Sequence, residues 1–252
     1  MKNNTMPKSQ RSTHYKRILL KLSGESLMGD KTSGIDPQTL KNIAFDIHST
    51  HTLGVQIAIV IGGGNIFRGI KSSEYSIERV TSDYMGMLAT IINALALNEA
   101  LNAAGSPSTV MTALEIERVV ESYTRERALR YLDQGRIVIF GGGTGNPYFT
   151  TDTAATLRAM EINAQAILKA TQVDGVYNQD PSKEPDAKLF STISYEEVLK
   201  NKLRVIDLTA ISMAMEQQVP IIVFNIGKRG NIKKIVAGHK VGTLIAGESN
   251  EG

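Results

Sequence analysis

Apolar runs that end in glycine or polar turns recur along this chain and alternate with segments of helical periodicity. This alternation is typical of a parallel β-sheet covered by helices on both faces, because parallel strands need crossover connections. The predicted strands are residues 17–22, 55–61, 109–112, 137–140, 164–169 and 221–225. The sequence therefore predicts an α/β fold with a central, mostly parallel sheet.

Two helix starts carry capping signals. Asp36 followed by Pro37 supplies an N-cap and a first-turn proline, and an apolar stripe at helical spacing follows as far as Gly54. Ser194 and Glu197 have the spacing of a capping box. We therefore expect helices to begin after Asp36 and after Ser194.

A third helical segment and one long loop complete the outline. An apolar stripe over residues 85–95 predicts a helix, with Met85, Met87 and Leu88 in the core or at a subunit interface. Residues 173–188 are polar and turn-rich, which predicts a surface loop or a subdomain seam.

Composition narrows the class of protein. No stretch reaches the ~20 consecutive apolar residues of a membrane span, and the N-terminus has no apolar signal-peptide core, so we expect a cytoplasmic protein without a membrane segment. The chain has 252 residues and no cysteine, which excludes disulfides, a thiolate nucleophile and a cysteine-ligated zinc site.

The basic charge is concentrated in a leader. Of the 28 basic residues, six precede the first acid, Glu25, which leaves 22 against 25 acidic residues. We expect residues 1–16 to be a disordered basic leader before a single domain at 17–247. Because the body is slightly acidic and no aromatic residues interleave with arginine, nucleic-acid binding is not expected.

Three glycine-containing loops follow predicted strands: LKLSGES at 20–26, IGGGNIFRG at 61–69 and FGGGTGNPYFTTD at 140–152. Glycines let backbone N–H groups approach a phosphate closely, which predicts a polyanionic ligand at the carboxyl edge of the sheet. Neither triple-glycine loop completes a dinucleotide fingerprint, since Phe67 and Asn146 stand where the last glycine is required. A Walker sequence fails as well, since Ile70 follows Gly69. A tight strand exit is the alternative to a phosphate cradle for each loop taken singly.

Two phosphate loops in one chain suggest two phosphorylated ligands, as in phosphoryl transfer. His14, His48, His51 and His239 all lie outside the loops and are expected on the surface. A phosphate monoester, with a second pKa of about 6, is already a nucleophile at neutral pH and needs no histidine base. The loops therefore favour a phosphate acceptor, with an aspartate base as the open alternative.

Six segments, in order, resemble the bacterial uridylate kinases (UMP kinases) of the amino acid kinase superfamily. They are KRILLKLSGESL, VIGGGNIFRG, SDYMGMLATIINALAL, GTGNPYFTTDTAA, LKATQVDGVYNQDP and VIDLTA. The resemblance implies a three-layer αβα sandwich that assembles as a homohexamer and, with Mg²⁺, transfers the γ-phosphoryl group of ATP to UMP in pyrimidine nucleotide biosynthesis. It also implies activation by GTP and inhibition by UTP.

The resemblance assigns roles to individual residues. It implies that Lys21 and Asp152 are catalytic, that residues 17–165 form mainly the UMP side and that residues 166–247 form mainly the ATP side. The implied ATP contacts are Lys21, Leu22, Ser23, Gly24, Gly64, Arg68, Thr171, Tyr177 and Asp180. The implied UMP contacts are Gly63, Asp83, Thr144, Gly145, Asn146, Pro147, Tyr148, Phe149, Thr150 and Thr151. The implied GTP segment is Gly29, Asp30, Lys31, Thr32, Ser33 and Gly34. No side chain is assigned as a direct metal ligand.

Simpler roles compete at several of these positions. Asp83 and Asp152 could cap the helices that follow them. Lys21 could be a strand-edge charge. Asp207 could cap its helix or organise the catalytic lysine, with the cap as the first choice, and Tyr177 could be an aromatic residue that packs on the sheet.

Three other functions remain as hypotheses at this stage. The first is a superfamily kinase with another acceptor, such as carbamate, acetylglutamate, aspartate or isopentenyl phosphate. The second is a dinucleotide-dependent oxidoreductase, and the third is a nucleotide sensor without catalytic activity.

Overall fold

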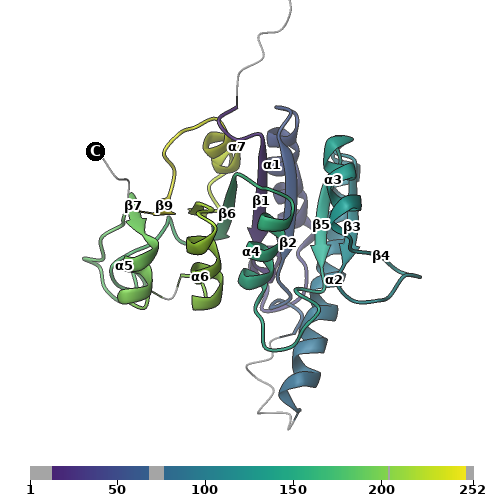
Figure 1. The fold of residues 1–252 in the computed structure, drawn as a ribbon, viewed down its shortest axis with the longest axis horizontal. Helices are drawn as coiled ribbons and strands as arrows, with labels where there is room; N and C mark the ends of the chain where they lie inside the picture. Colours follow the sequence, from purple (N-terminus) through teal and green to yellow (C-terminus); the bar gives the residue numbers. More distant parts are fainter. Residues whose placement is uncertain (1–12, 68–76, 204, 248–252) are drawn as a thin grey trace, which may run out of the picture.

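The computed structural model describes residues 13–67, 77–203 and 205–247, which form one sheet between two layers of helices (Figure 1). The nine strands of the described part are β1 (Arg17–Leu22), β2 (Gln56–Ile61), β3 (Ser108–Thr112), β4 (Glu121–Ser122), β5 (Ile137–Gly141), β6 (Ala166–Thr171), β7 (Thr192–Ser194), β8 (Ile221–Asn225) and β9 (Thr243–Ala246). Their order in the sheet is β4-β3-β5-β2-β1-β6-β8-β9-β7.

Strand direction places the loops. The first seven strands in this order, β4, β3, β5, β2, β1, β6 and β8, run parallel to one another. Strand β9 pairs antiparallel with β8, and β7 pairs parallel with β9. The segments that leave β1, β2, β5, β6 and β8 therefore emerge at one edge of the sheet, beyond the carboxyl ends of these strands.

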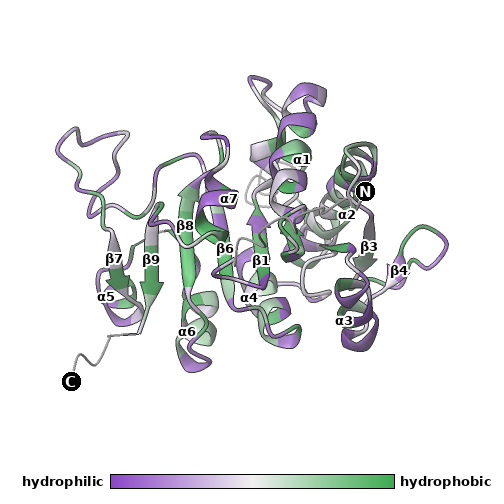
Figure 2. Ribbon diagram, turned by 90° about the horizontal axis from the view of Figure 1, so that it is seen from above, coloured by the Kyte–Doolittle hydropathy of each residue, from purple (hydrophilic) through white to green (hydrophobic). Residues whose placement is uncertain are grey.

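Helices cover both faces, as Figure 2 shows from above. The first layer contains α1 (Pro37–His51), α2 (Arg79–Ala103) and α7 (Asn231–Val236). The second contains α3 (Arg125–Asp133), α4 (Thr151–Glu161), α5 (Tyr195–Lys200) and α6 (Leu208–Glu216). A short 3₁₀ helix, η1 (Gly24–Leu27), follows β1. This three-layer arrangement confirms the predicted fold class.

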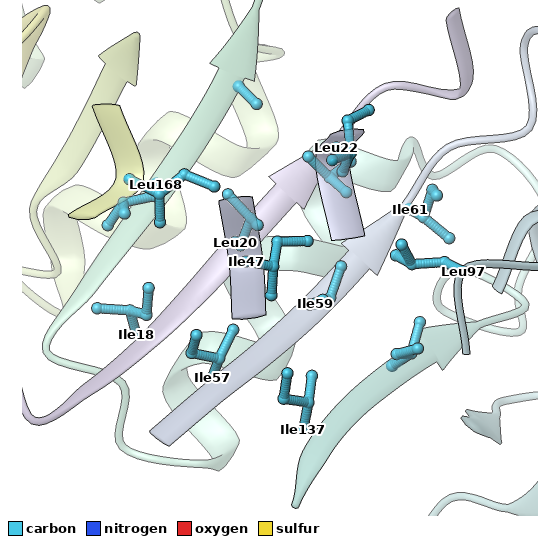
Figure 3. Close-up of a cluster of buried hydrophobic side chains, with 14 of the residues drawn as sticks. Ile18, Leu20, Leu22, Ile47, Ile57, Ile59, Ile61, Leu97, Ile137 and Leu168 are labelled. Atoms are coloured by element: carbon cyan, nitrogen blue, oxygen red, sulfur yellow. The ribbon is translucent and has the colours of Figure 1, made fainter. Parts of the chain in front are cut away.

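Two apolar cores lie on the two faces of the sheet, since successive strand residues point to opposite sides. Ile18, Leu20 and Leu22 of β1 face α1 and α2, where Figure 3 shows them beside Ile47 and other aliphatic side chains. Leu19 belongs to the opposite core. Lys21 follows the alternation of Leu19 and therefore points toward the face that α4 covers.

The six predicted strands are all present, with boundaries that differ by up to two residues. The structure adds β4, β7 and β9, which the sequence analysis did not predict. Both cap predictions are confirmed: the Asp36 side chain accepts a hydrogen bond from the Thr39 N–H, and Ser194 and Glu197 form a reciprocal capping box. Residues 173–188 form a surface loop, with one isolated bridge between Tyr177 and Leu189.

The first described residues already contact the rest of the domain. The leader prediction falls mostly on residues 1–12, outside the described residues, but the His14 N–H already donates to the Val236 carbonyl and Tyr15 packs on the core. Helix α2 is the one helix of the described chain long and apolar enough to cross a membrane. It packs against α1, β3 and β5 with nine of its residues buried, as expected of a core helix.

Candidate active site

Two lysines lie side by side at the carboxyl edge of the sheet. Lys21 of β1 and Lys169 of β6 are direct register partners on neighbouring parallel strands, so their side chains point to the same face. They are only 8% and 7% exposed, respectively. Two buried ammonium groups so close together require a counter-charge.

Asp152 supplies that charge. It lies in the first turn of α4, which packs across β1, β2 and β6, in front of β1 and β2 in Figure 1. Its Oδ1 lies 2.6 Å from the Nζ of Lys21, and its Oδ2 accepts a hydrogen bond from the Nζ of Lys169. Burial alone would raise the pKa of Asp152, but the two lysine charges outweigh it and hold the pKa below its ordinary value. The carboxylate is therefore ionised and shared between two cations.

Lys169 is the more perturbed of these groups. Burial and, to a smaller extent, the charge on Lys21 lower its pKa to about 8, against the opposing effect of the Asp152 charge. Such a group loses its proton at mildly alkaline pH. Strong pKa perturbation by burial and a specific charged partner is typical of functional sites.

Asp207 fixes the start of α4 from the neighbouring helix. Its carboxylate accepts hydrogen bonds from the hydroxyl of Thr150 and, at 3.1 Å, from that of Thr153, and it also caps α6 by accepting from the Ala210 N–H. Thr150 in turn caps α4 by accepting from the N–H groups of Asp152 and Thr153. The position of Asp152 is therefore held by contacts with α6 as well as by its own helix.

A cavity of about 170 Å³ lies on one side of this helix start. Gly63 and Gly64 of the loop after β2 line it together with Asp83 of α2. Its other lining residues are Phe67, Ser82, Gly86, Met87, Thr90, Gly143, Thr144, Phe149, Thr150 and Thr151. The triple-glycine loops after β2 and β5 therefore meet at one cavity.

Asp83 connects helix α2 to the loop after β5. Its carboxylate accepts a hydrogen bond of 2.8 Å from the Tyr148 N–H, and both of its oxygens lie 2.9 Å from the Nε of Arg79, which donates to them. Tyr148 has a left-handed backbone, with φ of 73°, and the guanidinium of Arg79 lies 5.6 Å from the centroid of its ring. Asp83 thereby stabilises an unfavourable backbone conformation in the loop.

Gly63 and Gly24 are places where a side chain does not fit. A Cβ on Gly63 would lie 2.8 Å from both the Ala89 Cβ and the Gly86 carbonyl oxygen of α2, and one on Gly24 would lie 2.4 Å from Asn65 Oδ1. The glycines thus let the loops after β1 and β2 approach each other and α2 closely.

A second cavity, of about 580 Å³, opens on the other side of the start of α4. It is lined by Lys169, Asp152 and Asp207. The segment after α5 supplies the other lining residues, which are Lys202, Leu203, Val205, Ile206 and Leu208. Because Thr150 and Thr151 line the first cavity and Asp152 the second, three consecutive residues separate the two spaces. The lysine pair lies next to this boundary.

Comparison with known proteins agrees with this geometry. The family model described as "Amino acid kinase family" matches residues 16–225. The chain belongs to the amino acid kinase family.

Solved structures of this family resemble the chain over nearly its whole length. The UMP kinase from Bacillus anthracis is 42% identical, with a TM-score of 0.91 over 93% of this chain and 97% of that one. The UMP kinase from Ureaplasma parvum is 35% identical, with a TM-score of 0.87 over 92% and 99%. The uridylate kinase from Archaeoglobus fulgidus is 28% identical, with a TM-score of 0.71 over 91% and 99%. Membership of a kinase family argues against the dinucleotide-dependent oxidoreductase.

The structure brings most of the residues predicted for the kinase site together. Lys21 and Asp152 are in contact, and Gly63, Gly64, Asp83, Thr144, Phe149, Thr150 and Thr151 share one cavity. Leu22, Ser23 and Gly24 form the exit of β1 beside that cavity, where Gly24 packs against Gly62 and Gly64. Gly145, Asn146, Pro147 and Tyr148 belong to the same loop but do not line the cavity.

Other predicted residues lie apart. Thr171 ends β6 at the same edge and donates to the Val173 carbonyl. Tyr177 and Asp180 lie in the following surface loop and line neither of the two cavities at the start of α4. Arg68 lies outside the described residues.

The predicted effector segment has its own surroundings. Gly29 and Asp30 line a separate cavity of about 300 Å³ beside α1, and the Gly34 N–H donates to the Asn65 carbonyl at 2.7 Å. Lys31 lies 3.6 Å from Asp36, and Thr32 and Ser33 are exposed.

Three of the simpler roles are wrong for physical reasons. Asp83 lies inside α2, whose N-cap is Glu78, and the N-cap of α4 is Thr150, so neither Asp83 nor Asp152 caps its helix. Lys21 is not an edge charge, because β1 lies between β2 and β6 and its side chain is buried. The cap role of Asp207 is confirmed, together with contacts to α4 that the sequence did not reveal.

The three residues of α2 that were predicted for the core or a subunit interface differ in exposure. Met87 is buried and lines the first cavity, whereas Met85 and Leu88 are 37% and 48% exposed. Lys169 was not predicted as a site residue. Its signal was a lysine inside an otherwise apolar strand, AILKAT, which parallels Lys21 in RILLKL.

Proposed function

We propose that this chain is an ATP-dependent UMP kinase that transfers the γ-phosphoryl group of ATP to the phosphate of UMP, giving ADP and UDP. The observation that carries the proposal is the pair of cavities that meet at Thr150–Asp152, beside two buried lysines joined by one carboxylate. The names of the solved relatives, at up to 42% identity, support UMP as the acceptor.

The glycine-lined cavity takes UMP in this proposal. Gly63, Gly64 and Gly143 of the two triple-glycine loops line it together with Thr144 and Thr151. Backbone N–H groups and hydroxyls of such residues suit a phosphate. Asp83 stands at its rim and accepts hydrogen bonds, as a ribose hydroxyl requires. The loop residues 145–149 are proposed to contact UMP as well. Phe149 lines the cavity, and the bond between Asp83 and the Tyr148 N–H holds the rest of the loop beside it.

ATP occupies the larger cavity, with its phosphates toward Lys169 and Lys21. Leu203, Val205 and Ile206 offer an apolar surface for the adenine ring. The exit of β1 from Leu22 to Gly24 lies beside the phosphates, and Thr171, Tyr177 and Asp180 are proposed to contact the nucleoside from the loop after β6. Arg68 is proposed to join this site from outside the described residues.

The chain needs no histidine for the transfer itself. The UMP phosphate, with a second pKa of about 6, is a dianion at neutral pH and attacks the γ-phosphorus directly. Lys21 and Lys169 offset the charge that develops on the transferred group and on the leaving oxygen. Asp152 positions both ammonium groups, because each of its oxygens pairs with one of them.

Mg²⁺ is proposed to arrive with ATP. Among the described residues no group of three or more histidines or carboxylates could hold a metal ion, and the Asp152 oxygens are engaged by lysines. This donor set fits magnesium, which typically keeps several waters and binds mainly through substrate phosphates. When bound, the ion neutralises charge on the phosphates, with Asp152 and Asp207 as the nearby carboxylates.

The test is a coupled assay of ADP release with a panel of acceptors. UMP should support turnover, whereas carbamate, acetylglutamate, aspartate and isopentenyl phosphate should not. Lys21→Ala should lower kcat more than it lowers UMP affinity. Turnover with a carboxylate acceptor and none with UMP would overturn the proposal, and a nucleotide sensor would bind both nucleotides without releasing ADP.

The remaining implications of the family resemblance are proposals of the same kind. Activation by GTP through Gly29–Gly34 and inhibition by UTP are tested by adding each effector to the assay. A homohexamer is supported by large apolar side chains that are exposed on α1 and α2, namely Phe45, Tyr84, Met85, Leu88 and Ile92. Light scattering measures the mass of the assembly. A cytoplasmic location and a place in pyrimidine nucleotide synthesis follow from the same assignment.

A further inference from the structure

Two polar side chains on one turn of helix α2 face the two triple-glycine loops. Thr90 and Asn93 are 2% and 0% exposed, in a helix whose other buried residues are mostly apolar. Three residues apart on a helix, they lie on the same face. Buried polar groups of this kind are costly unless they are hydrogen-bonded, so their partners carry information about their role.

Thr90 holds the loop after β5. Its Oγ1 accepts a hydrogen bond of 2.7 Å from the Gly142 N–H and donates one of 2.7 Å to the Met87 carbonyl. Gly142 has a left-handed backbone, with φ of 78°. The bond from Gly142 to Thr90 thus fixes the first residue of this loop beyond the strand.

Asn93 holds the loop after β2. Its Nδ2 donates to the Gly62 carbonyl at 2.7 Å and to the Asn65 Oδ1 at 2.6 Å. The Asn65 Nδ2 returns a bond of 3.1 Å to the Asn93 Oδ1 and donates to the Gly34 carbonyl at 2.9 Å. Both side-chain amides therefore use all their N–H groups, and both are buried.

The two loops also touch α2 directly. A Cβ on Gly63 would lie 2.8 Å from the Ala89 Cβ, and one on Gly141 would lie 3.0 Å from the Ile91 Cγ1. The backbones therefore rest on the helix with no intervening side chain. Sterics set their distance from α2, and the bonds of Thr90 and Asn93 set their position along it.

We propose that Thr90 and Asn93 are positioning residues that hold the two glycine loops at a fixed spacing. This inference rests on the proposed function, because the loops would bind the acceptor phosphate, whose distance from the transferred group would follow from that spacing. Neither side chain needs to react. Thr90 lines the acceptor cavity, but its hydroxyl is already committed to two backbone groups.

Thr90→Val tests this directly, since valine keeps the shape and removes the hydroxyl. Thr90→Ser restores the hydroxyl and serves as the rescue. Thr50→Val is the matched control: Thr50 is also a buried helical threonine, with 0% exposure, and its hydroxyl donates only to the Asp46 carbonyl of its own helix, α1. The three variants therefore separate a lost buried hydroxyl from a lost loop anchor.

Two measurements are made on the full-length chain. Hydrogen exchange of the peptide over residues 138–150 should become faster in T90V and remain like wild type in T50V and T90S. In the kinase assay, T90V should lower kcat/KM for UMP by about tenfold or more, as expected of a misplaced reactant. T90S should stay within about threefold of wild type, T50V should stay within about twofold, and KM for ATP should not change.

The outcomes are distinct. Wild-type exchange in T90V, or a kinetic loss no larger than that of T50V, would overturn the positioning role. If the wild-type chain does not phosphorylate UMP, the proposed function fails, and the exchange experiment still decides whether Thr90 anchors the loop. If T90V does not fold, Thr90→Ala replaces it in both measurements.

Discussion

Replacing Asp152 by asparagine should destabilise the protein in a pH-dependent way. The variant keeps the shape of the side chain but leaves Lys21 and Lys169 as adjacent buried cations. Breaking a buried ion pair by removing one partner typically costs about 3–5 kcal/mol. We expect a loss in this range at neutral pH for the Asp152→Asn variant.

The pH dependence follows from Lys169. Its folded pKa, about 8, lies below the ordinary value of 10.5, so the unfolded state binds more protons across this interval and stability rises with pH there. Without Asp152 the folded pKa falls further, and Lys169 becomes neutral at lower pH. Deprotonating a group one pH unit below its pKa costs about 1.4 kcal/mol. The difference in stability between variant and wild type due to Lys169 is thus about 1.4 kcal/mol at pH 7, larger at pH 6 and near zero at pH 9.

Urea unfolding followed by circular dichroism from pH 6 to pH 9, at one protein concentration and without nucleotide, measures this difference. Asp133→Asn is the matched control, because Asp133 pairs with Arg17 at 3.1 Å but is 64% exposed. Its loss should stay within about 1 kcal/mol. In the double variant Asp152→Asn with Lys169→Met, the free energy of unfolding should no longer carry the pH dependence that Lys169 causes. An Asp152→Asn loss that is equal at pH 6 and pH 9, or no larger than that of the control, would refute the shared-carboxylate argument.

Three further outcomes are expected. The kcat/KM for ATP should fall as pH rises through about 8, as Lys169 loses its charge, and Lys169→Arg should remove this limb from the pH–rate profile. Gly63→Ala should lower the free energy of unfolding by about 1–3 kcal/mol in urea titrations, because its Cβ would meet α2 at 2.8 Å. Asp83→Ala should raise KM for UMP about tenfold, through loss of a charge-assisted bond to the Tyr148 N–H, and should leave KM for ATP unchanged in initial-rate measurements.

The central sheet could be predicted because its strands are nearly continuous apolar runs. Strands β1, β2, β5, β6 and β8 are buried on both faces, so their sequences carry a strong local signal. The missed strands lack it: β4 has two residues, β7 has three, and β9 has four and runs antiparallel to its neighbour β8. These pairings depend on tertiary neighbours that no local pattern encodes.

The glycine loops at the carboxyl edge of the sheet could also be predicted, but not the contacts that hold them in place. Glycines and hydroxyls after apolar runs are a local signal that lies within a few residues of sequence. The anchors are remote: Thr90 contacts Gly142 across 52 positions, and Asp83 contacts Tyr148 across 65. In the sequence, Thr90 and Asn93 are simply polar residues within an apolar helix. Their role becomes visible only when both loops lie against that helix.

Lys169 shows how far sequence reasoning can be extended once strand order is known. Strands β1 and β6 each carry one lysine within an apolar run, and each lysine alone has many possible roles. The order β2-β1-β6 and the register that pairs Lys21 with Lys169 place both charges on one buried face. Electrostatics then requires a carboxylate on the helix that crosses this face, and Asp152 is the acidic residue in the first turn of α4. Local pattern leaves open whether Asp152 caps its helix or has another role. Strand order and burial show that it is instead the charge partner of the two lysines.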